Sequence, residues 1–204
     1  MLDESAKAAQ EIAKTTGKAV DAAHDVGRFL GRVFGAVPED LVGILGGDWL
    51  HQKRQENIQI MAEMTEARLR ARKVDRLRQV SPNVAISLLK QAADENREEL
   101  LEVWARLMAA AMDPKKAGDV RQSFVEAVKQ FDPLDARILT AIAGPPTVGV
   151  HNVERTSIAV EASQDQTIVS LQNLTKIGCL EHRANFSNLA LSAMGRELMR
   201  VLSD

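Results

Sequence analysis

Apolar side chains recur at intervals of three and four residues along most of this chain, which is the spacing of one face of an α-helix. The alternating pattern of a half-buried strand is confined to residues 179–183 and 188–192. Because there is no tyrosine and there are only two tryptophans and five phenylalanines, the core must be filled by aliphatic side chains, methionine and alanine. The sequence therefore predicts a mainly α fold with one short β-hairpin.

Two regions of different organisation follow one another, separated at Asp132-Pro133. Residues 1–131 begin with predicted long helices over 3–34 and 38–73, so we expect an N-terminal helical bundle there. Residues 132–204 predict three helices, the hairpin and a closing helix, which is the order of a small winged helix-turn-helix domain. The predicted shorter helices cover 83–93, 94–112, 120–131, 134–143, 154–162, 163–177 and 193–202.

Several of these helices carry signals for their ends. Ser81 predicts the N-cap of a helix, and Pro82 predicts its first residue. Ser163 with Gln166 three residues later predicts a capping box, and Gly178 predicts the end of that same helix. The buried stripe expected on this helix is Ile168, Leu171, Leu174 and Ile177.

The charge balance gives no overall attraction for nucleic acid or anionic lipid, because 26 Lys and Arg stand against 28 Asp and Glu. The N-terminus carries Asp3 and Glu4 where a secretory leader has basic residues, so we expect no export. The apolar window 29–50 contains Pro38 and several charges and does not predict a transmembrane helix. A single cysteine, Cys179, fits a reducing compartment. We expect a cytoplasmic protein that can associate with a membrane.

Glycines spaced four residues apart give the first helix an unusual face. Each interior glycine costs a helix about 1 kcal/mol relative to alanine, so several in register require a packing reason. One reason is close contact inside the bundle, and the other is self-association or membrane contact, for which the neighbouring apolar side chains are suited. The residues predicted for this second role are Gly27, Phe29, Leu30, Gly31, Phe34, Gly35, Gly43 and Gly47.

A basic run covers residues 67–78, with six Lys and Arg and one Asp. If the helix continues through the run, Arg68, Arg72 and Arg76 share one face that could hold phosphate or anionic lipid. We favour the alternative that the run is a solvent-exposed face paired with the acids of residues 94–102. The candidates for an anionic partner are Arg68, Arg72, Lys73, Arg76 and Arg78.

The acidic residues within 94–102 are a further candidate site for chemistry. Asp94, Glu98 and Glu102 share a helical face and could bind Mg²⁺ or act as an acid and base pair. We favour an exposed face, because acids suit the first turns of a helix and Glu102 can pair with Arg106. The four histidines are scattered, and the phosphate-loop, dinucleotide and serine-nucleophile motifs are missing. The sequence therefore predicts no catalytic residue, metal site or cofactor, and we expect a protein that is not an enzyme.

Polar side chains on the third helix of the winged-helix region form another candidate partner face. Such side chains can read base edges in DNA. Residues 131–204, however, carry six Lys or Arg against eight Asp or Glu, so the attraction for phosphate is missing. The face is therefore predicted to serve a protein partner more readily than nucleic acid, and its residues are Gln166, Thr167, Ser170, Asn173 and Lys176.

Several stretches resemble the bacterial abortive infection alpha family. They are Lys14–Ala19 with Gly31–Gly35, Leu101–Met108 running on through Ala111–Pro114, and Ser123–Glu126 followed by Asp132–Leu139. Leu191–Leu198 is also similar to the end of many winged helices. The resemblance implies a part in defence against bacteriophage, in which an infected cell stops growing or dies before virus is released. Its motifs are packing motifs and bring no catalytic residues.

The leading hypothesis is a non-enzymatic abortive infection protein that acts through its glycine-rich helices and senses a trigger with its winged helix. We expect a homo-oligomer, a membrane surface as partner on activation, and a phage or host protein as trigger. Two alternatives stay open: a winged-helix regulator that binds DNA, and a soluble scaffold or assembly protein.

Overall fold

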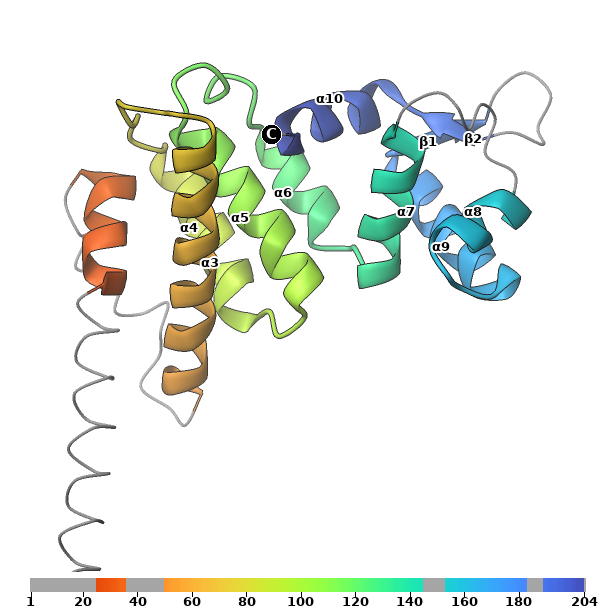
Figure 1. Ribbon diagram of the computed structural model, residues 1–204, viewed down its shortest axis with the longest axis horizontal. Helices are drawn as coiled ribbons and strands as arrows, with labels where there is room; N and C mark the ends of the chain where they lie inside the picture. Colours follow the sequence, from red (N-terminus) through yellow and green to blue (C-terminus); the bar gives the residue numbers. More distant parts are fainter. Residues whose placement is uncertain (1–24, 36–49, 145–152, 183–188, 204) are drawn as a thin grey trace, which may run out of the picture.

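A computed structural model describes residues 25–35, 50–144, 153–182 and 189–203, and it is mainly helical, as the sequence predicts (Figure 1). A helical segment covers residues 25–34. The helices of the first half are α3 (His51–Ala71), α4 (Pro82–Asp94), α5 (Glu98–Met112) and α6 (Gln122–Val128). The second half contains α7 (Pro133–Ala143), α8 (Val153–Ala159), α9 (Gln164–Ile177), β1 (Leu180–His182), β2 (Leu189–Leu191) and α10 (Ala193–Leu202).

The predicted signals place both ends of α9. Gln166 N–H donates to Ser163 Oγ at 3.2 Å, and Ser163 N–H donates to Gln166 Oε1 at 3.1 Å, so the capping box is confirmed. Gly178 ends the helix with a φ of +89°, a backbone conformation that glycine adopts without strain. The predicted start of α4 is also confirmed, since the helix begins at Pro82.

The start of α5 differs from the prediction that Asp94 caps this helix, because the cap is Arg97 and the helix begins at Glu98. The carboxylate of Glu95 accepts the backbone N–H groups of Asn96 and Arg97, both at 3.0 Å, and ties these residues into a loop. Burial raises the pKa of Glu95, but hydrogen bonds from the side chain and backbone of Arg97 outweigh burial and hold that pKa below its usual value. A local carboxylate therefore competes with the helix for the backbone donors.

The end of α3 also comes earlier than predicted, at Ala71. Lys73 has a φ of +53°, and its N–H donates to Arg70 O at 3.0 Å. Val74 N–H donates to Leu69 O at 3.0 Å, which completes a helix-ending motif that glycine usually occupies. The second half of the basic run consequently lies beyond the helix.

Helix α5 is the centre of the molecule. It packs against α3, α4, α7 and α10, and its buried side chains include Trp104, Leu107 and Met108. The buried core is a single cluster with members on both sides of residue 132. The division into domains 1–131 and 132–204 stays a prediction.

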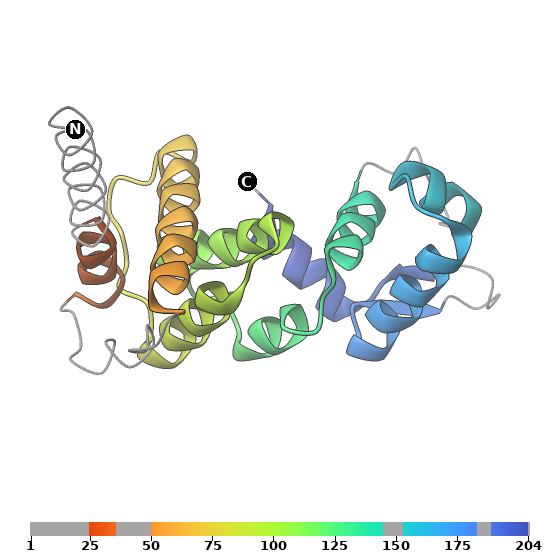
Figure 2. The same ribbon diagram turned by 90° about the horizontal axis from the view of Figure 1, so that it is seen from below.

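The C-terminal elements follow the predicted order of three helices, two strands and one helix. The strands are antiparallel, with Leu180 opposite Leu191 and His182 opposite Leu189. After the second strand, α10 runs back toward α5, so its C-terminal end lies beside the first half of the molecule (Figures 1 and 2).

Candidate functional site

The helical segment 25–34 lies beside α3 and is attached to the bundle by one apolar face (Figure 1). Val26, Phe29, Leu30 and Val33 are buried, at the three- and four-residue spacing of a helix stripe. The backbone adds one connection, because Val80 N–H donates to Val33 O at 2.9 Å.

The burial of this stripe corrects one expectation. Phe29 and Leu30 were expected at a surface for partner or membrane contact, but their exposed fractions are 0% and 8%. Burying a side chain of this size is worth about 1.5–3 kcal/mol, so the bundle is the more stable place for both. Phe34 is partly buried against the same core. In this conformation these apolar side chains pack against the bundle.

Two of the predicted glycines lie on the open side of the segment. A Cβ atom built at Gly27 or Gly31 meets no heavy atom within 4 Å. Close packing inside the described part of the chain therefore does not explain them. Gly35 differs, because its φ of +78° ends the segment. Gly43 and Gly47 lie outside the described residues.

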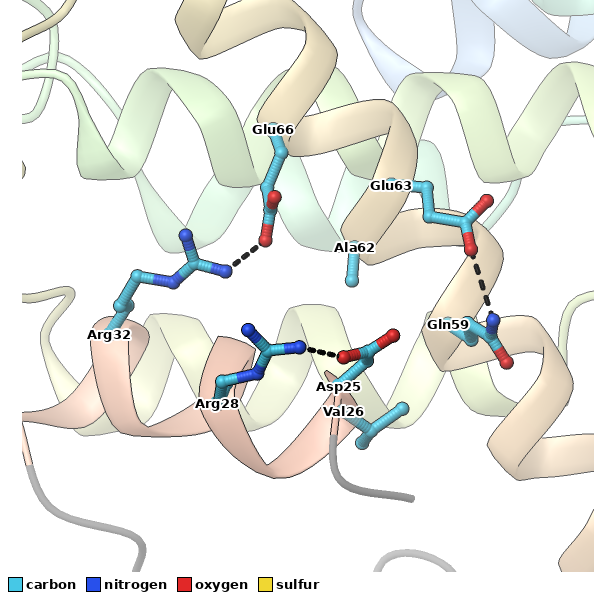
Figure 3. A pocket seen from close by; sticks show the side chains of 8 residues that line it. All are labelled: Asp25, Val26, Arg28, Arg32, Gln59, Ala62, Glu63 and Glu66. Carbon is cyan, nitrogen blue, oxygen red and sulfur yellow. Dashed lines mark hydrogen bonds and ion pairs between the residues drawn. The ribbon is translucent and has the colours of Figure 1, made fainter. Parts of the chain in front are cut away.

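A hollow of about 470 Å³ lies between this segment and α3. Figure 3 shows that charged and polar side chains from both elements line it. Arg28 pairs with Asp25 on its own helix, and Arg32 pairs with Glu66 of α3. The carboxylate of Glu63 accepts the Gln59 amide at 3.0 Å. Such exposed pairs contribute little to stability, so this edge of the segment is held weakly.

The basic run does not form the predicted common face. Arg76 and Arg78 lie beyond the end of α3, so Arg76 shares no helical face with Arg68 and Arg72. Arg68 pairs with Glu102 of α5, which confirms for this residue the favoured alternative of pairing with the acids. Glu102 also accepts Arg106 Nε at 2.8 Å, as the four-residue spacing predicts.

Two other members of the run are placed apart from that network. Arg72 Nη2 donates to Ser203 O near the end of α10, at 2.8 Å. Lys73 holds the helix end described above. The acids themselves gather at no metal site, because the described residues contain no group of three or more His, Cys, Asp or Glu placed to hold a metal ion.

The predicted partner face of α9 is only partly exposed: Gln166 and Lys176 are exposed as predicted, whereas two of the other residues are buried. Thr167 and Ser170 are buried, and Gln166 is engaged in the capping box. Asn173 Nδ2 donates to Asp135 Oδ2 at 2.7 Å and to Gln130 O at 3.0 Å. Lys176 remains exposed, as expected.

The reason is that α9 is rotated about its own axis relative to the orientation in which the predicted stripe would be buried. Thr167 Oγ1 donates to Ser163 O at 2.9 Å, so a small hydroxyl residue is satisfied within its own helix and can be buried. Ile168 and Val169 are exposed instead, at 38% and 66%. The prediction that Ile168 is buried is therefore wrong, and the open face of α9 is more apolar than expected.

Asp135 carries a buried carboxylate that the sequence alone did not single out. Its Oδ2 accepts Asp132 N–H at 2.8 Å as well as the Asn173 amide, while Oδ1 is buried without a hydrogen-bond partner. Burial, followed by the charge of Asp135, raises the pKa of the Cys179 thiol to about 12. The Asp132–Asp135 spacing is that of a capping box and was the available signal.

Comparison with known proteins gives one match. The family described as "Abortive infection alpha" matches residues 53–193. Neither a curated protein nor a solved structure matches the chain. Within the described residues, each helix is too short or too polar to cross a membrane.

Proposed function

Since this chain belongs to the abortive infection alpha family, we propose that it acts without catalysis in abortive infection, and that self-association of the 25–34 segment is the step that carries the response. An infected cell that stops growing before phage is released protects its neighbours. The segment would pair with the same segment of a second copy, side by side across Gly27 and Gly31.

The open space at Gly27 and Gly31 is the observation that supports this proposal. Two helix-interior glycines together cost about 2 kcal/mol relative to alanine, and no contact within the described chain uses them. A glycine face four residues apart allows a second backbone to approach closely. Phe29 and Leu30 strengthen this arrangement, because their burial fixes which side of the segment faces outward.

Contact with a membrane surface belongs to a later, activated state in this proposal. Phe29 and Leu30 are buried in the resting structure, so they reach lipid only after the segment leaves α3. The exposed ion pairs along that edge oppose release only weakly. Self-association of the open glycine face needs no such release and would come first.

The C-terminal elements would form a winged helix that docks a phage or host protein as the trigger. Ile168 and Val169 support a protein partner, since exposed β-branched side chains suit an apolar contact better than a phosphate backbone. The excess of acids over bases in residues 131–204 has the same implication. Binding of duplex DNA by the purified protein at low salt would contradict this assignment.

A substitution at Gly31 tests the proposed function. Gly31→Leu places a better helix former where the described chain leaves space, so the protein should fold with an unfolding temperature at least as high as that of the unsubstituted protein. Cells that express this variant should lose protection, measured as the efficiency with which phage form plaques. Gly118→Leu is the matched control, because a Cβ there also meets nothing within 4 Å, and it should keep protection. A folded Gly31→Leu protein that protects fully would refute the proposal.

A further inference from the structure

Helix α10 is attached at its two ends by different kinds of contact. At its start, Ser192 N–H donates to Cys179 O at 3.0 Å, and Gly195 N–H donates to Ser192 Oγ at 3.0 Å. A Cβ atom at Gly195 would lie 2.1 Å from Cys179 O, so this turn rests directly on the backbone. The N-terminal end of α10 is thus fixed by close backbone packing.

The C-terminal end of α10 is held by cationic side chains from three separate parts of the chain. Arg106 Nη1 of α5 donates to Leu202 O at 3.0 Å. Arg72 Nη2, directly after α3, donates to Ser203 O at 2.8 Å, and Lys116 Nζ donates to the same oxygen at 2.5 Å. The last carbonyls of a helix carry partial negative charge, which these cations stabilise.

An ion pair on the exposed side of α10 supports the same end. Arg200 Nη1 donates to Asp119 Oδ2 at 3.0 Å, and Arg200 Nη2 donates to Glu197 Oε2 at 2.7 Å. Asp119 and Lys116 both belong to the turn after α5, so this turn holds α10 through one cation and one anion. Of the basic residues predicted for an anionic partner, Arg72 thus binds the end of this chain's own helix.

A hollow of about 470 Å³ that is open to solvent lies between α5, α7, α8 and α10. Its apolar floor includes Val103, Phe131 and Leu139, and α10 contributes Met199 and Leu202. Arg106, which holds the helix end, also lines it. Hollows of this size with mostly apolar walls and a few charged groups are typical of binding sites.

We propose that α10 is a strap with a hinge at Ser192–Gly195 and a latch formed by Arg72, Arg106 and Lys116. Opening the latch swings the C-terminal end of α10 away from α5 and widens the mouth of the hollow. Burial of Leu198, Val201 and Leu202 keeps the strap closed at rest, so the open form is a minor state. The contacts of Arg72 and Lys116 with the end of α10 are exposed and that of Arg106 is partly buried, and together they set how often the latch opens. This device is independent of the glycine contact proposed above.

Residue-resolved amide hydrogen exchange of the full chain tests the strap. The double substitution Arg72→Gln with Lys116→Gln removes two latch donors and should speed exchange in the last two turns of α10 by about tenfold. The amides of Ser192 and Gly195 at the hinge, and those of α3 and α5, should keep their rates. Lys115→Gln is the matched control, since its neighbour and not Lys115 itself reaches the α10 carbonyls, and it should change nothing.

Two outcomes would overturn the proposal. One is unchanged exchange in α10 of the folded double variant. The other is acceleration that extends equally to the hinge amides and to α5, which would mean that the latch supports the whole fold. If the double variant does not fold, Lys116→Gln alone provides the same comparison, with an expected acceleration of about threefold.

Discussion

The 25–34 segment and α10 lie on opposite sides of the bundle around α3 and α5, and they are attached to it in opposite ways (Figures 1 and 2). The segment buries four apolar side chains. Among the described residues, no heavy atom lies within 4 Å of a Cβ atom built at Gly27 or Gly31. Helix α10 instead places Gly195 directly against a carbonyl. Glycine within a helix therefore occurs here in two settings: Gly195 permits close packing within the molecule, whereas Gly27 and Gly31 have no close neighbour among the described residues and belong to the proposed contact surface.

This difference determines which substitutions harm the fold and which harm only function. Where a glycine is already in contact with backbone, any side chain must displace something. Where the described residues leave space around a glycine, they tolerate an added side chain, and under the proposal above the contact that is lost is the one with a second copy. Substitutions of Phe29, Gly195 and Gly31 test this distinction, and the largest change in the free energy of unfolding is expected at Phe29.

Phe29→Ala should destabilise the protein by about 3–5 kcal/mol, because Phe29 is fully buried and its removal leaves a cavity beside α3. Urea unfolding of the purified protein measures this loss. Phe34→Ala, at a partly buried position on the same segment, should cost less. A loss below about 1 kcal/mol for Phe29→Ala would show that the segment is not anchored by its apolar face.

Gly195→Ala should destabilise by about 2 kcal/mol. The added methyl group would lie 2.1 Å from Cys179 O, and the strain of forcing the two backbones apart exceeds the gain in helix propensity. Thermal or urea unfolding tests the sign as well as the size. An unchanged or raised stability would mean that the start of α10 is not a fixed hinge.

Gly31→Ala should have the opposite sign and raise stability by up to about 1 kcal/mol, since alanine favours the helix and meets no neighbour within the described chain. The same unfolding experiment applies. Loss of stability would place Gly31 in a tight contact within the protein and remove the basis for an outward glycine face.

The smallest effect concerns the thiol beneath the hinge. Burial, with the charge of Asp135, raises the pKa of Cys179 to about 12, so the group stays protonated at pH 8 in the folded protein. Iodoacetamide should therefore leave native Cys179 unmodified while it labels the unfolded chain, as mass spectrometry can show. Labelling of the native protein would mean that the hinge opens.

The sequence predicts the elements of this fold better than their orientation. Spacing and capping residues place the start of α4 and both ends of α9, because these signals act over a few neighbouring residues. The rotation of α9 depends on which side chains its neighbours can accept. Thr167 satisfies its own hydroxyl and is buried, and Ile168 is left exposed.

The candidate site likewise has features that the sequence predicts and orientations that it does not. The four-residue glycine spacing is visible in the sequence, but the direction in which Gly31 faces depends on the burial of Phe29. The basic run is equally visible, whereas its contact with Ser203 joins residues 131 positions apart along the chain. No local pattern encodes a contact between such distant segments.

The most direct test of the central claim is a disulfide between two copies of the segment in cells under phage challenge. Gly31→Cys should give a crosslinked dimer on mild oxidation, because paired segments bring the two Cα atoms within about 7 Å, the limit for a disulfide. Native Cys179 is buried and needs no replacement, and Gly118→Cys is the control that should self-associate without forming the crosslink. A Gly31→Cys protein that protects the cells but never crosslinks would contradict self-association through the glycine face.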